Sequence, residues 1–112
     1  HAVAHEWGHH IEWTLAPNAY DAGLSDPAIR VGMELLADCF AGASLRPLYD
    51  RGILLPADLE SLRALSLLLG DDRGTGLPLP PGFVGGHGTG AQRLAAFDQG
   101  FAGGTFESCV SR

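Results

Sequence analysis

Two histidines four residues apart, His5 and His9, stand near the beginning of the chain within the sequence HEWGHH. Four residues make roughly one helical turn, so in a helix both imidazoles project from one face and can bind the same metal ion. Glu6 follows the first histidine directly and would lie beside that ion. This HExxH pattern predicts a zinc ion with a carboxylate placed to act as general base in peptide hydrolysis.

A third ligand is expected from the segment MELLADCF, because catalytic zinc takes three protein ligands and keeps a fourth position open. This segment places Glu34 and Asp38 four residues apart in an otherwise apolar stretch. Burying two carboxylates there is costly unless they are paired or bind a metal. We expect Glu34 to bind the metal and Asp38 to accept a hydrogen bond from a ligand histidine. Two alternatives are that both acids face solvent, and that His1 is the third ligand.

Two further residues of the first helix are informative. Gly8 costs a helix roughly 0.5–1 kcal/mol relative to alanine, so we expect another backbone or a ligand to come close to it. His10 points about 100° away from His9. We therefore expect His10 to pack locally or face solvent.

Two residues near the last helix are candidates for supporting roles. His87 stands between glycines at the end of a long loop and is a candidate donor to the oxyanion of the reaction; the alternative is a locally packed loop histidine. Arg93 is expected to pair with Asp71 or Asp72, or to form a surface ion pair.

The elements that must position these residues are helices, because apolar residues recur at intervals of three and four. The second helix has a start signal at Ser25-Asp26-Pro27. We expect Pro47 to end or kink it, and Arg51-Gly52 is a further stop signal. Thr89 and Gln92 form a capping box for the last helix. The helices are expected over residues 1–15, 26 to about 45, 56–69, and from residue 90 onward.

The buried faces of the later helices follow from the same spacing. The third helix is expected to bury its leucines, and the last helix its leucine and phenylalanines. These positions are Leu59, Leu62, Leu65, Leu68 and Leu69 in the third helix, and Leu94, Phe97 and Phe101 in the last.

The fold class is therefore mainly α, with about four helices. Residues 71–88 are rich in glycine and proline and form one long loop. A chain of 112 residues makes at most one domain, so we expect residues 1–112 to form a single catalytic core. Because the first residue is a histidine inside a helical pattern, we interpret the chain as lacking an upstream region.

Composition excludes some partners. Seven basic and thirteen acidic residues give a net charge of −6, with no basic run, which argues against nucleic acid. No apolar stretch approaches the roughly 20 residues that span a bilayer, and no signal peptide is visible. We expect no membrane contact from this part of the protein.

The two cysteines, Cys39 and Cys109, form one disulfide or remain buried thiols. A bridge would close a loop of about 70 residues and stabilise the fold by about 4 kcal/mol. It would also favour an extracytoplasmic location.

Several motifs, taken in order, resemble one bacterial family, the putative neutral zinc metallopeptidases. They are HEWGHH, ELLADCFAG, the Gly70-Asp71-Asp72 turn, HGTGAQR and FDQGFAGGTFESC. The resemblance implies that His5 and His9 bind zinc, that Glu6 is catalytic, and that Glu34 is the third ligand. It also implies a preceding region, often with a membrane anchor. Trp7 and Glu12 depart from the family pattern, which more often has a small or aliphatic residue and an amide there.

Three functions remain open at this point. The first is a zinc-dependent peptidase, an endopeptidase in our interpretation, acting on a peptide or protein substrate with Glu6 as general base. The second is an inactive metal-binding domain of the same fold. The third, a metal-free helical interaction module, is the least favoured because Glu34 and Asp38 would be buried without partners.

Overall fold

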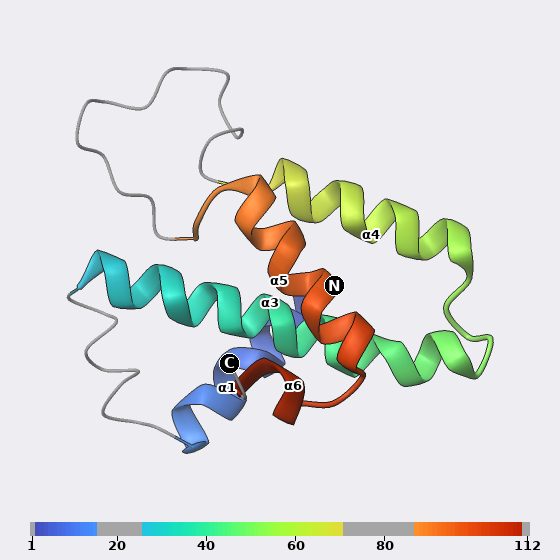
Figure 1. The fold of residues 1–112 in the computed structure, drawn as a ribbon, viewed down its shortest axis with the longest axis horizontal. Helices are drawn as coiled ribbons and strands as arrows, with labels where there is room; N and C mark the ends of the chain where they lie inside the picture. The colour runs from blue at the N-terminus through green and yellow to red at the C-terminus, as the bar shows by residue number, and fades with distance from the viewer. Residues whose placement is uncertain (1, 16–25, 71–86, 111–112) are drawn as a thin grey trace.

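The computed structural model describes residues 2–15, 26–70 and 87–110, and this part of the chain is helical with no strand. The prediction of a mainly α fold is confirmed. Figure 1 shows the helices, which are α1 (Ala2–Leu15), α3 (Pro27–Asp50), α4 (Pro56–Leu68), α5 (Gly90–Gly103) and the short α6 (Glu107–Val110).

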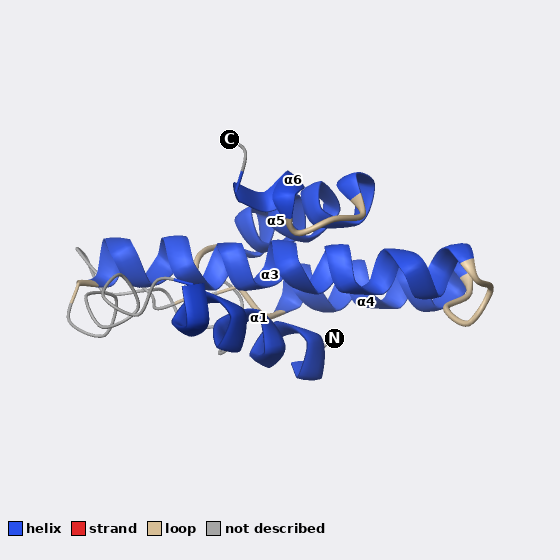
Figure 2. Cartoon of the chain, turned by 90° about the horizontal axis from the view of Figure 1, so that it is seen from below, coloured by secondary structure: helices blue, strands red, loops and turns tan. Residues whose placement is uncertain are grey.

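Helix α3 is the central element. Helix α1 packs on one side of it, and α5 and α6 lie on the opposite side (Figure 2). Helix α4 packs against α5. The segments HEWGHH and MELLADCF, which hold the predicted metal ligands, therefore lie on two helices in direct contact, α1 and α3.

The predicted start signals act as expected. The Asp26 side chain accepts hydrogen bonds from the backbone N–H groups of Ala28 and Ile29, with Pro27 in the first turn. Thr89 and Gln92 form the predicted capping box of α5. Both helices thus begin where local sequence alone places their first turns.

The prediction that Pro47 ends or kinks the second helix near residue 45 was wrong about where the helix ends. Helix α3 continues through Pro47 to Asp50 and ends at the further stop predicted at Arg51-Gly52. Proline removes one backbone hydrogen bond, but the last turn has compensating contacts. Arg46 pairs with Asp50 at 2.9 Å, and the ring of Tyr49 packs edge-on against Phe101 of α5. Tertiary packing therefore extends the helix beyond the point where propensity would stop it.

The predicted leucine core of α4 was also wrong in part. Leu65, Leu68 and Leu69 are exposed, Leu68 by 59%, and the buried residue of this helix is Ser66. Gly90 lets the backbones of α4 and α5 come into contact. A Cβ placed on it would lie 2.0 Å from the carbonyl oxygen of Leu67. The contact is therefore between backbones, which leaves several leucines outside it.

The core lies where α3, α5 and α6 meet. Its buried side chains are Cys39, Phe40, Ala43, Ala96 and Cys109, and Phe97 of α5 is fully buried as predicted. Leu94 and Phe101 are half-buried. The sulfur atoms of Cys39 and Cys109 are bonded, so the two cysteines form a disulfide that joins α3 to α6. Helix α6 was not predicted, because four residues are too few to show a period.

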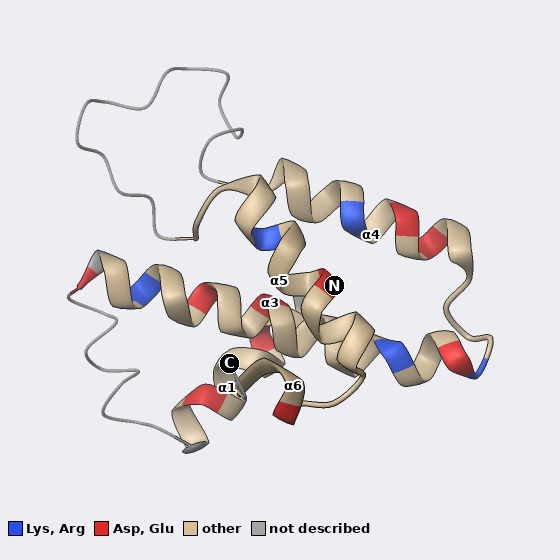
Figure 3. Cartoon of the chain, in the orientation of Figure 1, with Lys and Arg blue, Asp and Glu red and all other residues tan. Residues whose placement is uncertain are grey.

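The charged residues of the described helices are interspersed. Figure 3 shows acidic positions on every helix and separate basic positions on α3, α4 and α5, without a basic cluster on one helix. In the same part of the chain, no helix is both long enough and apolar enough to cross a bilayer.

Candidate metal centre

The side chains of His5, His9 and Glu34 converge between α1 and α3. The Nε2 atom of His5 lies 2.9 Å from Glu34 Oε2, and the Nε2 atom of His9 lies 3.1 Å from Glu34 Oε1. The three residues can offer one ligand atom each within 4.8 Å of one another. The structure thus brings together the three residues predicted to bind metal. His1 lies outside the described residues.

A close approach of two helices makes this convergence possible. A Cβ placed on Gly8 would lie 2.9 Å from both the Cα and the carbonyl oxygen of Ala37. Real Cβ atoms do not approach backbone atoms so closely, so only glycine fits at this crossing without a shift of one helix. The prediction that Gly8 accommodates a neighbouring backbone is confirmed.

The outer nitrogen of His5 donates to a buried carboxylate, as predicted. His5 Nδ1 lies 2.7 Å from Asp38 Oδ1, and Asp38 is fully buried. Because Asp38 holds the proton on Nδ1, the proton that a metal would displace is the one on Nε2, which gives the tautomer that binds a metal through Nε2. Asp38 therefore fixes both the orientation and the tautomer of this imidazole.

Arg93 of α5 holds Asp38 in turn. Its Nε donates to Asp38 Oδ2 at 2.8 Å and its Nη2 to Asp38 Oδ1 at 3.0 Å, while Nη1 donates to the carbonyl of Leu69 at 3.0 Å. The prediction of a surface ion pair for Arg93 was wrong, because its side chain is buried. The predicted partners Asp71 and Asp72 lie outside the described residues.

The outer nitrogen of His9 has a different partner, for which no role was predicted. His9 Nδ1 donates to Glu12 Oε2 at 2.9 Å. Glu12 is buried, and its second oxygen, Oε1, finds no hydrogen-bond partner among the described residues. The signal that reveals this pair is the i,i+3 spacing of the two residues on one helix.

Electrostatics within this cluster follow from these contacts. Burial alone would lower the pKa of His5, but hydrogen bonds to Asp38 and Glu34 raise it to about 9. Hydrogen bonds to Glu12 and Glu34 raise the pKa of His9 to about 10 despite its burial. Burial would raise the pKa of Glu34, but the two imidazoles hold it far below its usual range. Burial raises the pKa of Glu12.

The donor set fits zinc. Two imidazole nitrogens and one carboxylate form the His2Glu set of catalytic zinc sites, and each imidazole donates its other N–H to a carboxylate. Bond lengths of 2.0–2.1 Å in a tetrahedral site separate ligand atoms by about 3.3 Å. The observed separations of 2.9 and 3.1 Å, each to a different oxygen of Glu34, are close to this value, and one ligand atom from each residue lies within 4.8 Å of the others.

The remaining candidates lie outside this cluster. Glu6 is exposed on α1 directly after His5. His87 is exposed, just before α5, and is not part of the metal-binding group, so its role stays a prediction. His10 is exposed and stacks on Trp7 with ring centroids 4.9 Å apart, which agrees with the expected packing role.

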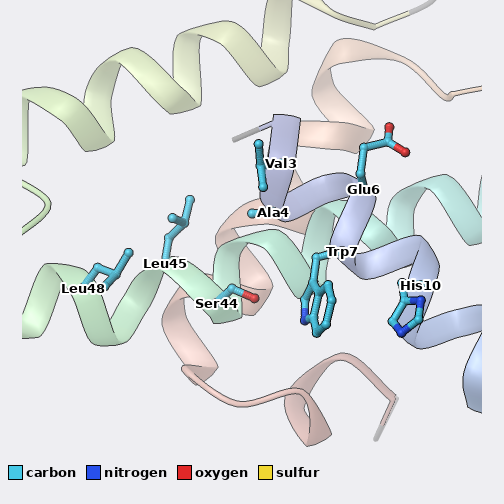
Figure 4. Close-up of a pocket in the computed structure, with 8 residues that line it drawn as sticks. All are labelled: Val3, Ala4, Glu6, Trp7, His10, Ser44, Leu45 and Leu48. Atoms are coloured by element: carbon cyan, nitrogen blue, oxygen red, sulfur yellow. The ribbon is translucent and has the colours of Figure 1, made fainter.

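A separate hollow of about 780 Å³ borders α1 and the later part of α3. Figure 4 shows Glu6 projecting from α1 away from Trp7 and His10. The hollow's lining includes Val3 and Leu45 but none of the three residues that converge at the metal centre. Because Glu6 is also part of the lining, the hollow adjoins the metal centre on the side of this carboxylate.

Comparisons with known proteins agree with this geometry. The family described as "Putative neutral zinc metallopeptidase" matches residues 1–111. "Uncharacterized protein YpfJ" of Escherichia coli strain K12 is 34% identical over 122 residues, covering 97% of this chain and 41% of the relative. The protein of the same name from Escherichia coli O6:H1 strain CFT073 matches equally. The chain thus spans less than half the length of these relatives. No solved structure matches the chain.

Proposed function

Because the chain belongs to the family of putative neutral zinc metallopeptidases, we propose that it is a zinc-dependent endopeptidase acting on a peptide or protein substrate. One observation carries the proposal. Both imidazole Nε2 atoms point at one carboxylate, and both Nδ1 atoms are tied to buried acids. A family name alone would not distinguish an intact metal site from a degraded one.

His5, His9 and Glu34 would hold the metal, with Asp38 and Glu12 fixing the imidazoles. A bound zinc ion supplies Lewis-acid polarisation of the scissile carbonyl and lowers the pKa of water for attack. Glu6 accepts a proton from the attacking water and then delivers it to the leaving amine. Its exposure next to His5 is consistent with this task, because a general base must reach the substrate.

Two further parts of the proposal come from the sequence. We assign to His87 a hydrogen bond to the developing oxyanion, from its place ahead of α5. We also place the protein outside the bacterial cytoplasm. The Cys39–Cys109 disulfide supports this location, because such bridges persist in oxidising compartments.

The substitution Glu6→Gln tests the function. We expect it to leave zinc content unchanged and to reduce cleavage of a mixed peptide library by at least about 100-fold, within the usual range for a general base. The matched control is Glu60→Gln, which removes an exposed carboxylate from α4 and should cleave like wild type.

Two outcomes would overturn the proposal. If wild type and Glu6→Gln both bind zinc and cleave equally poorly, the chain is an inactive metal-binding domain. If wild type binds no zinc, it is a metal-free module. Zinc binding has to be measured directly, because the buried acids have partners even without a metal. Glu34 pairs with His5 and His9, and Asp38 pairs with Arg93, so burial of these acids does not by itself argue against a metal-free module.

A further inference from the structure

We infer that Arg93 is a positioning residue for the metal centre. Its guanidinium holds the Asp38 carboxylate, and Asp38 holds His5 in the orientation and tautomer that bind metal. This inference rests on the proposed function for the identity of the metal. It extends that function to α5, which supplies none of the three predicted ligands.

The contacts form one continuous chain across three helices. The fork of Arg93 binds both oxygens of Asp38, at 2.8 and 3.0 Å, and the oxygen that accepts from Nη2 also accepts from His5 Nδ1. A fork on both oxygens prevents the carboxylate from rotating, because each oxygen has a fixed donor. The direction of the His5 ring is then set by a residue on a different helix.

The guanidinium is itself fixed in place. Nη1 donates to the carbonyl of Leu69 at the end of α4, and Gly70 crosses Gly90 so closely that a Cβ on Gly70 would lie 1.9 Å from the Gly90 nitrogen. The backbone of α5 near Arg93 therefore cannot shift without moving the end of α4. A guanidinium held in this way fixes Asp38, and Asp38 fixes the His5 imidazole.

Stability alone does not account for this arrangement. A buried ion pair repays its desolvation poorly, and well-packed apolar residues of similar volume are often at least as stabilising. Both Asp38 and Arg93 are buried. An apolar pair could not accept a hydrogen bond from His5 Nδ1. The Asp38–Arg93 pair does, so its role is to position this imidazole.

The chain contains a matched control between two helices, α4 and α5. Arg63 of α4 binds Asp98 of α5 through the same two-pronged geometry, with both distances 2.9 Å, but this pair is exposed and does not touch the metal centre. Removing the Arg63 fork tests the loss of an inter-helix ion pair alone. Removing the Arg93 fork tests the same loss together with the link to His5.

The first measurement is zinc affinity, by competition with a chromophoric chelator. We expect Arg93→Met to weaken zinc binding about 10-fold, the lower end of the range for losing the direct partner of a metal ligand, because Arg93 acts through Asp38. Arg93→Lys keeps the charge without the fork and should recover part of the loss. Arg63→Met should stay within about twofold of wild type. An Arg93→Met affinity as close to wild type as this control overturns the inference.

The second measurement is the His5 Nδ1 proton in the NMR spectrum of the zinc-loaded protein. We expect this proton to exchange with solvent at least tenfold faster in Arg93→Lys than in wild type. The corresponding proton of His9, bound to Glu12, should be unchanged and serves as an internal control. Equal acceleration at both histidines would show general loosening and would contradict a positioning role.

This second measurement also decides the case in which Arg93→Met does not fold. Arg93→Lys then carries the test, and unchanged His5 exchange with unchanged zinc affinity overturns the inference. Neither readout uses peptide cleavage. A failure of the inference is therefore distinguishable from a failure of the proposed peptidase activity, which Glu6→Gln tests with Arg93 intact.

Discussion

The two halves of the metal centre are held by different means. His5 depends on a carboxylate 33 positions further along the chain, which is held in turn by an arginine another 55 positions on. His9 depends on Glu12, three residues away on its own helix. One half is therefore assembled by tertiary structure, whereas the other forms whenever α1 is helical.

The two acids also differ in how well they are satisfied. Asp38 has hydrogen-bond donors on both oxygens, whereas Glu12 has one buried oxygen without a partner among the described residues. A fully satisfied buried carboxylate fixes its neighbours, and a half-satisfied one leaves them freedom and costs free energy. The His5 half thus has the greater order, and it requires more of the fold to remain intact.

The largest expected effect comes from breaking the tertiary half. We predict that Asp38→Asn lowers the free energy of unfolding by about 3–5 kcal/mol, because it leaves Arg93 buried without a counter-charge. Glu12→Gln, the matched change in the local half, should cost less than about 1 kcal/mol, since an amide oxygen still accepts from His9. Urea denaturation in excess chelator measures both. Equal losses would contradict the difference between the halves.

A change of pH probes both halves together. The pKa of His5 is about 9 and that of His9 about 10, so both rings are protonated on both nitrogens at pH 7 before a cation binds. Zinc must therefore displace one proton from each ring. We predict that zinc affinity rises by about 100-fold per pH unit between pH 6.5 and 8.5, which is tenfold for each proton. Titration calorimetry in buffers of different ionisation enthalpy counts the released protons. Release of one proton or none would show that an imidazole is already neutral.

Stability without the metal should follow the opposite trend. Both histidine pKa values are raised above 6.5, so their contribution is complete below pH 6.5 and is lost as pH rises through 9 and 10. The lowered pKa of Glu34 contributes stability above about pH 4.5, and that contribution is lost as pH falls toward the folded-state pKa. The metal-free chain should therefore be most stable between about pH 4.5 and 6.5.

A smaller effect is expected where the two helices cross. We predict that Gly8→Ala destabilises the chain by about 1–3 kcal/mol, because the new methyl group overlaps the backbone of Ala37 and pushes α1 away from α3. The contact of His5 with Asp38 should weaken, while the contact of His9 with Glu12 within α1 persists. Thermal unfolding and the two Nδ1 proton signals measure this.

The control for this change is Gly32→Ala on α3, where a new Cβ meets nothing within 4 Å. It should stabilise the chain by roughly 0.5–1 kcal/mol through helix propensity. A destabilisation of the same size at both positions would show that the crossing is not tightly packed.

Much of the candidate site was predictable, for reasons that can be stated residue by residue. The spacing of His5 and His9 fixes their common face in any helix, and two acids in an apolar segment require partners. Arg93 was misassigned because an arginine four residues into a capped helix looks the same in sequence whether its face meets solvent or a buried acid. The exposed Leu68 was misassigned for the converse reason, since helical spacing marks an apolar face without showing which element covers it.

The sequence by itself determined the local features of this protein: its helices and their caps, the shared face of the two imidazoles, and a glycine where a backbone must pass. Only the tertiary structure decided that α3 continues past Pro47, that Arg93 reaches Asp38, and that Glu34 meets both histidines. The physical reason is range. Periodicity and capping act over a few residues, whereas buried charges find their partners only after helices distant in sequence have packed.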